Sequence, residues 1–346
     1  MARSLSFIII SMTIMMACKA FFPSSPIQKI ASPLPPTVPT DIPPLPPTEV
    51  SLSTEVSLST DIPPLPPTEA LAIEPAPIEV KISTNEKDGA ELVNVPAGEF
   101  LMGSTQEQAD AAWEEAKKAY PNMEKKWFDA EVPQRTVNLD EYWIYKTEVT
   151  NAQYAKCVGA GSCIESLSLN TNSKDSNYAQ HPVEDVIWEQ AKAYCEWAGG
   201  RLSSEAEWEK AARGTDGRTY PWGNQGVSGE LLNYCDANCE FEVADKSIDD
   251  SNKETAAVGS YLAGASPYGA LDMVGNVREW VQDWYDEGYY ANAPKDNPKG
   301  PSSGEYRVLR GGSWGGEARL MCVADRNRSG PANRDFDYGF RCIGLP

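Results

Sequence analysis

RVLRGGSWGGEARLMCVADRNRSGPANRDFDYGFRC occupies residues 307–342, near the C-terminus, and carries the strongest structural signals in the chain. It opens with RGGSW at 310–314, where two glycines permit a tight backbone passage that side chains would block. It closes with GFRC at 339–342, which predicts a short final strand with an apolar anchor. The residues between are rich in Gly, Asn, Asp, Ser and Arg, which is the composition of a loop. Because a long loop held between fixed ends is often functional, we expect the function to depend on this segment.

The composition excludes several classes of function. The 346 residues carry a formal net charge of -20, so nucleic acid is not an expected partner, since it requires clustered Lys and Arg. The single histidine, His181, excludes sites that need two or three imidazoles, such as the common catalytic zinc sites. We expect His181, which precedes a proline, to cap or pack the start of a strand.

Residues 1–18, MARSLSFIIISMTIMMAC, predict a lipoprotein signal peptide. The apolar run is too short to span a bilayer and follows a basic residue. It ends in a sequence that resembles a bacterial lipobox, so we expect lipidation of Cys18. An ordinary secretory signal is the alternative. Either interpretation places the mature protein outside the cytoplasm, and lipidation makes it a membrane-anchored lipoprotein of the bacterial cell envelope or surface.

Residues 19–88 predict a disordered, Pro-rich stalk. The sequence TDIPPLPPTE occurs at 40–49 and again at 60–69. Such segments favour an extended polyproline conformation and form no core. A ligand for a Pro-binding module is the alternative interpretation.

Residues 89–346 are expected to form one globular domain. The pattern at 92–104 predicts two short strands around a turn, and the alternation at 132–150 predicts a half-buried strand. Helices are predicted within 105–131, after Thr150, over 186–200 and after the capping box at Ser204. The ten tryptophans are expected to pack in the core of an irregular fold.

Several ordered pieces of this domain resemble the formylglycine-generating enzyme (sulfatase-modifying factor) family. They are VNVPAGEFLMGS, YKTEVTNAQYAKC, HPVEDVIWEQAKAYCEWAGGRLSSEAEWEKAARG, YPWGN, YGALDMVGNVREWVQDWY, RGGSW and GFRC. The resemblance implies an α+β domain with little regular secondary structure, related to the C-type lectin fold.

The resemblance also implies a chemistry that this sequence departs from. The enzymes oxidise a cysteine of a sulfatase to formylglycine, with oxygen and a copper ion held by two thiols in the pattern W-x-C-x4-C. Counted from Trp314, those positions hold Gly316 and Met321, and Cys322 has no partner nearby. Because a two-thiolate site needs both sulfurs, we expect neither copper binding nor formylglycine-generating activity.

Eight cysteines suggest disulfides in an exported chain. With Cys18 lipidated the remaining number is odd, so at least one thiol stays unpaired. The resemblance pairs Cys195 with Cys342, and Cys322 is left over. Two further local pairs are expected, Cys157 with Cys163 and Cys235 with Cys239. Half of a metal site is the alternative for the last pair, but no second half is found.

The resemblance implies structural Ca2+ at two sets of residues, because mixed carboxylate, amide and carbonyl oxygens suit that ion. The first set is Asn233 and Asp250 by side chain with Tyr234 and Asn252 by carbonyl. The second set is Asn276 and Glu279 by side chain with Val274, Gly275 and Val277 by backbone.

Three functions remain open at this stage. The first is a binding module for a protein or glycan, whose candidate contact residues are Trp314, Gly316, Arg319, Met321, Asp325, Asn327, Asp335, Phe336, Asp337 and Tyr338. In a specific form of it, the segment resembles the variable regions of diversity-generating retroelement proteins, which use the same fold. The second is an enzyme in the same cleft, either formylglycine-generating or of altered chemistry. The third is a structural role in a surface complex.

Overall fold

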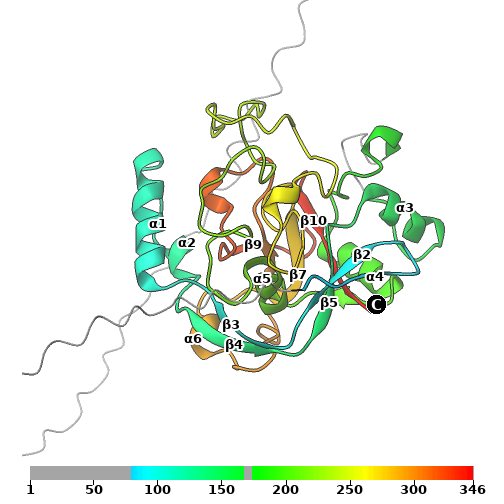
Figure 1. Cartoon of the computed structure of the whole chain (residues 1–346), viewed down its shortest axis with the longest axis horizontal. Helices are drawn as coiled ribbons and strands as arrows, with labels where there is room; N and C mark the ends of the chain where they lie inside the picture. Colours follow the sequence, from blue (N-terminus) through cyan, green and yellow to red (C-terminus); the bar gives the residue numbers. More distant parts are fainter. Residues whose placement is uncertain (1–78, 167–173, 346) are drawn as a thin grey trace, which may run out of the picture. The chain divides into compact units, whose positions relative to one another are not determined.

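The computed structural model describes residues 79–166 and 174–345 (Figure 1). The chain separates into residues 1–72 and 73–346, and every described residue belongs to the second part. The predicted signal peptide, Cys18 and nearly all of the predicted stalk therefore lie outside the described residues. None of the described helices combines the length and apolar character needed to cross a bilayer.

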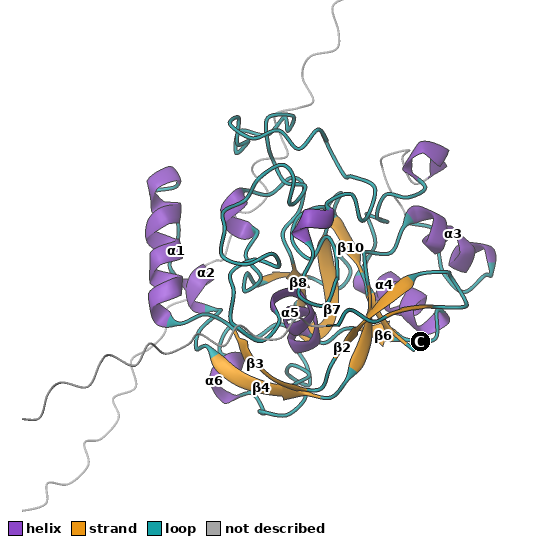
Figure 2. Ribbon diagram, in the orientation of Figure 1, coloured by secondary structure: helices purple, strands orange, loops and turns teal. Residues whose placement is uncertain are grey.

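Much of the described chain runs as loops between short elements (Figure 2). The helices are α1 (Gln106–Ala119), α2 (Lys126–Asp129), α3 (Asn151–Gly159), α4 (Trp188–Trp197), α5 (Glu205–Arg213) and α6 (Tyr289–Asn292), with 3-10 turns η2 (Ser176–Tyr178), η3 (Leu262–Gly264) and η4 (Ala318–Leu320). The strands are β1 (Ile82–Thr84), β2 (Glu91–Val95), β3 (Gly98–Met102), β4 (Arg135–Leu139), β5 (Tyr142–Tyr145), β6 (Arg201–Leu202), β7 (Arg278–Trp284), β8 (Arg307–Arg310), β9 (Asn327–Ser329), β10 (Tyr338–Phe340) and β11 (Cys342–Gly344). This mixture confirms the α+β class.

A five-stranded sheet in the order β1-β2-β5-β11-β6 joins the two ends of the domain. Its edge strand β1 pairs with β2 antiparallel, Ile82 opposite Val93. Residue 89 is therefore too late as the start of the domain, because β1 precedes it. The expected strand over 132–150 is two strands, β4 and β5, which belong to different sheets: β4 pairs with β3, and β5 with β2 and β11.

A four-stranded sheet in the order β10-β7-β8-β9 carries the start of the C-terminal segment. The predicted single final strand is also two strands, since β10 lies beside β7 and β11 beside β5. The chain passes from one sheet to the other at Arg341, which is fully buried. Its guanidinium donates to Glu279 and to the carbonyls of Leu271 and Asp272, so this crossing is fixed by an ion pair in the core.

Local capping signals predicted the helix starts well. At the start of α3, Thr150 Oγ1 accepts a hydrogen bond from Gln153 N, and Gln153 Oε1 accepts one from Thr150 N. Ser204 and Glu207 form the same reciprocal pair at α5. Each box satisfies backbone donors that a helix start leaves free.

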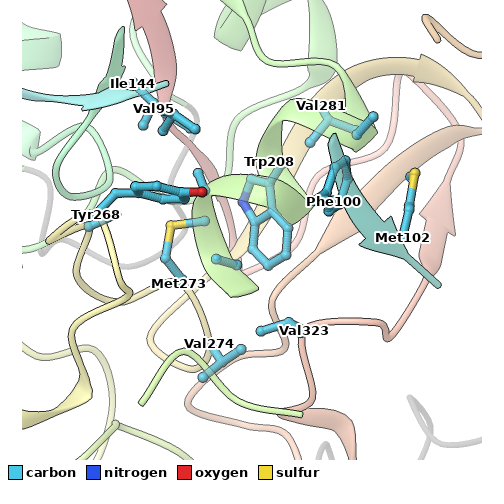
Figure 3. Close-up of a cluster of buried hydrophobic side chains, with 14 of the residues drawn as sticks. Val95, Phe100, Met102, Ile144, Trp208, Tyr268, Met273, Val274, Val281 and Val323 are labelled. Atoms are coloured by element: carbon cyan, nitrogen blue, oxygen red, sulfur yellow. The ribbon is translucent and has the colours of Figure 1, made fainter. Parts of the chain in front are cut away.

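Trp208 of α5 lies at the centre of the main core (Figure 3). Its ring packs among apolar side chains of β3, β7 and the loop before β7, including Phe100, Val281 and Met273. Truncation of such a buried ring costs about 3–5 kcal/mol. Trp127 departs from the expectation that tryptophans pack in the core, since 58% of it is exposed.

All three expected disulfides are present. Cys195 in α4 is bonded to Cys342 in β11 across 147 residues. The two local bonds are Cys157–Cys163 and Cys235–Cys239.

Candidate functional site

The two glycines after β8 make the turn that presents Trp314. Gly311 and Gly312 have φ values of +95° and +67°, in the left-handed region. A Cβ on Gly312 would lie 2.7 Å from the sulfur of Met321 and 2.9 Å from the carbonyl oxygen of Leu320. Side chains are therefore excluded there by both conformation and space. The predicted tight passage is confirmed.

Gly316 and Met321, at the positions of the copper-binding cysteines of formylglycine-generating enzymes, lie against each other. A Cβ on Gly316 would be 2.9 Å from the terminal methyl of Met321, which is fully buried. One position has no side chain and the other has a packed thioether. Copper in a two-thiolate site does not fit these residues.

Cys322 is the one cysteine outside a disulfide among the described residues. Burial raises the pKa of its thiol well above the usual value, and the carboxylates of Glu131 and Asp325 raise it further. A thiol held protonated is a poor nucleophile and a poor metal ligand.

A buried ion-pair group holds the loop beneath these positions. Arg310, at the end of β8, donates to Glu209 at 2.6 Å and to the carbonyl of Val323 at 2.7 Å. Arg326 donates to both carboxylate oxygens of Glu205, at 2.8 and 3.0 Å. The four side chains are almost wholly excluded from solvent. Such pairs fix geometry, because separating buried charges is costly.

Three rings form what we call the aromatic face: Trp314, Phe241 and Phe336. Trp314 stacks on Phe241 with centroids 5.7 Å apart, and Phe336 lies 5.2 Å from Trp314. Phe241 and Phe336 are 42% and 36% exposed, whereas Trp314 is 8% exposed. The buried indole Nε1 of Trp314 donates to no acceptor among the described residues. The face therefore combines exposed apolar rings with an unsatisfied donor.

The other predicted contact residues divide by exposure. Asp335 is exposed beside Phe336, and Arg319 is paired with Glu317 at 2.7 Å. Partly exposed positions are Asp325, Asn327 and Tyr338. Four positions need correction, because Gly316, Met321, Asp337 and Trp314 are buried. Gly316 and Met321 pack together, and Asp337 accepts from Ser313 and Arg278. Trp314 is only 8% exposed and lies against the rings of Phe241 and Phe336.

Phe241 is a residue of the aromatic face that the sequence did not predict. It follows the Cys235–Cys239 disulfide, far from the C-terminal segment in sequence. The signal available was an aromatic residue in a disulfide-closed insert, which does not by itself indicate proximity to Trp314. His181, as expected, has a packing role: its ring lies 4.6 Å from that of Tyr178, and its Nδ1 lies 3.0 Å from Thr255 Oγ1.

In the first set of expected calcium ligands, Asp250 lies in contact with Tyr234 and Asn252. Asp250 accepts from the backbone N–H groups of Tyr234 at 3.1 Å and Asn252 at 2.8 Å. The Oδ1 of Asn233 is buried without a hydrogen-bond partner among the described residues. Burial raises the pKa of Asp250 to about 7. The unpartnered amide oxygen of Asn233 fits a hard cation, whereas both oxygens of Asp250 already accept backbone hydrogen bonds.

The second set fits less well. Both carboxylate oxygens of Glu279 accept from Arg341, at 2.7–2.9 Å, and one also accepts from Trp208 Nε1 at 2.9 Å. Asn276 Oδ1 accepts from Ala256 N at 2.9 Å. The side-chain oxygens of this set are thus engaged by protein donors. Among the described residues, no three His, Cys, Asp or Glu side chains form a group that could hold a metal ion.

The fold and the RGGSW turn are those of a sulfatase-modifying factor type of domain. The model of the sulfatase-modifying factor enzyme 1-like domain matches residues 79–344, so the chain belongs to this family.

Its relatives include a formylglycine-generating enzyme and a larger protein kinase. The formylglycine-generating enzyme of Streptomyces coelicolor is 32% identical over 317 residues, which cover 79% of this chain and 93% of that enzyme. The serine/threonine-protein kinase pkn1 of Chlamydia pneumoniae is 34% identical over 269 residues. The match covers 73% of this chain but spans only 37% of the kinase.

Solved structures share the fold. PvdO from Pseudomonas aeruginosa superposes with a TM-score of 0.59 at 24% identity, covering 77% of this chain and 98% of PvdO. Treponema denticola variable protein 1 gives a TM-score of 0.55, also at 24% identity, and covers 77% of this chain and 99% of that protein.

Proposed function

We propose that this protein is an exported, lipid-anchored member of the family that binds a protein or glycan through the aromatic face and does not generate formylglycine. The observation that carries the proposal is the contact between Gly316 and Met321, at the two positions where the enzymes hold copper. Exposed Phe241 and Phe336 support the binding role, because apolar rings gathered on a surface are typical of an interaction site.

The loss of the copper site is tested by restoring it. The double variant Gly316→Cys/Met321→Cys supplies both sulfurs and removes the methyl that a new Cβ would meet. We expect the variant to bind Cu(I) in competition with a chelator and the native protein not to bind it there. Thiolate-type Cu(I) binding by the native protein, lost in Cys322→Ser, would contradict the proposal.

The binding role is tested on glycan and protein arrays. A ligand of the aromatic face should lose most of its signal with Phe336→Ala. Leu262→Ala is the matched control, because Leu262 is 72% exposed but lies in η3. Equal loss with both variants would refute the assignment of this face.

Membrane anchoring and calcium are parts of the same proposal. Cys18 would carry the lipid, so metabolic labelling with a fatty acid should mark the protein and Cys18→Ser should abolish the label. Structural Ca2+ would be held at the first ligand set, by Asn233 and Asp250 with the carbonyls of Tyr234 and Asn252.

A diversified receptor is a second candidate, supported by the exposure of Asn333, Asp335 and Phe336 within the C-terminal loop. A near-copy of the 3′ end of the gene beside a reverse transcriptase gene would establish it, and its absence from the genome would exclude it.

A further inference from the structure

A hollow lies near the start of β8, whereas Trp314 follows the end of that strand. It has a volume of about 210 Å³, and its walls include Lys126, Trp127, Tyr285, Tyr306, Arg326 and Arg328. We call it the arginine pocket. Tyr306 directly precedes β8, and Arg328 lies in β9 opposite Val308, so the pocket and the aromatic face are separate.

Aromatic rings make two walls of this pocket. Trp127, in α2, is 58% exposed and Tyr306 is 37% exposed, although most large rings among the described residues are buried or partly buried. Tyr285 is partly buried on the same hollow. Rings left in contact with water around a concavity are typical of ligand sites, where they pack on the apolar face of a bound ring.

The base of the pocket is rigid. Arg326 is buried, and its guanidinium is held by Glu205 and by the carbonyl of Ala130 at 2.7 Å. The same guanidinium lies 4.1 Å from the ring centroid of Tyr290. The charge of Arg326 is therefore balanced within the protein, and its side chain forms a fixed base of the pocket.

The charge available to a ligand comes from Arg328. Its guanidinium lies 4.5 Å from the ring of Tyr285 and 5.7 Å from that of Tyr306. Arg328 is exposed and forms no ion pair with a carboxylate of the described residues. Lys126 also lines the pocket but is paired with Glu124, and Glu287 contributes one negative charge. A guanidinium that forms no ion pair and lies over aromatic rings favours a small ligand with an anionic group.

We propose that the arginine pocket binds an anionic sugar unit, a six-membered sugar ring that carries a carboxylate or sulfate. The volume lies below the roughly 300–1,000 Å³ of drug-sized sites and suits one ring. Trp127 and Tyr306 would face the C–H surface of the ring, and Arg328 would bind the anionic group through paired N–H donors. The amide of Asn327 would reach the hydroxyl groups. The proposal does not depend on the aromatic face.

The test uses methyl β-D-glucuronide, the neutral methyl β-D-glucoside and an aspartate-rich peptide as probes. Saturation-transfer NMR and calorimetry are carried out on the full chain, with Arg328→Ala, Arg328→Lys and Trp127→Ala as variants. Both positions are exposed, and thermal melts establish that each variant is folded. Phe336→Ala is the control at the aromatic face.

We expect the glucuronide to bind at least about tenfold more tightly than the glucoside, since a charged hydrogen bond distinguishes them. Arg328→Ala should abolish that preference, Arg328→Lys should retain part of it, and Trp127→Ala should weaken both sugars. Phe336→Ala should change nothing. No saturation transfer from the glucuronide, equal binding by native protein and pocket variants, or displacement of the glucuronide by a lower concentration of the peptide would overturn the proposal.

Discussion

Replacement of Glu279 by glutamine should destabilise the domain strongly, because it leaves Arg341 buried without its charge partner. The guanidinium Nη2 lies 2.7 Å from Glu279 Oε1, and both side chains are at most 1% exposed. Removal of one partner from a buried pair costs about 3–5 kcal/mol. For a domain of this size, the melting temperature should fall by roughly 6–20 °C.

The stability lost in Glu279→Gln should also depend on pH. Asp272 lies beside Arg341, and burial raises its pKa to about 6. Above that pH its carboxylate is ionised and partly replaces the missing charge, whereas below it the group is neutral. The variant should therefore lose more stability at pH 5 than at pH 8, relative to the native protein at each pH.

The assay is urea denaturation followed by tryptophan fluorescence, with Glu91→Gln as the matched control. Glu91 pairs with Lys146 at 2.8 Å but is 54% exposed, so its loss should cost less than about 1 kcal/mol. The reasoning is refuted if Glu279→Gln costs no more than Glu91→Gln at either pH.

Three further predictions are tested by urea denaturation or, for Ca2+, by thermal unfolding. Burial raises the pKa of Glu131 from 4.5 to about 7, so native stability should fall by about 3 kcal/mol as pH rises from about 4.5 to about 7. Glu131→Gln should remove that fall, and an unchanged pH slope would show that Glu131 is not responsible. Replacing Cys195 and Cys342 by alanine opens a loop of 147 residues and should cost about 5 kcal/mol on the chain-entropy model; a loss below about 1 kcal/mol would count against that value. Added Ca2+ should raise the melting temperature of the native protein but not of Asp250→Asn, and an equal rise in both would place the ion elsewhere.

Local signals predicted much of the secondary structure. The capping boxes at Thr150 and Ser204 depend on residues three positions apart, so sequence alone identifies them. The division of the last strand at Arg341 could not be predicted, because it arises from contacts with Glu279 and with carbonyls some 70 residues away. A one-dimensional pattern of alternating residues does not report which sheet a strand joins.

The candidate site was predicted in part for the same reason. Trp314 is marked by the glycines before it, whereas Phe241 reaches the aromatic face from a distant insert. Met321 looked like a surface position within a polar loop, but the thioether fills the space beside two glycines and is buried. Its residue type predicts a core position for Trp127, whereas α2 places its ring on the arginine pocket.

Turnover is the decisive measurement for the proposed loss of activity. Purified protein would be supplied with copper, oxygen, a thiol reductant and a peptide that carries the sulfatase motif, and the peptide would be analysed by mass spectrometry for the aldehyde. The Streptomyces coelicolor enzyme would serve as the positive control. We predict unchanged peptide with this protein, because Gly316 and Met321 supply no thiol. Aldehyde formed at a rate that depends on copper would contradict the proposal that the domain acts by binding.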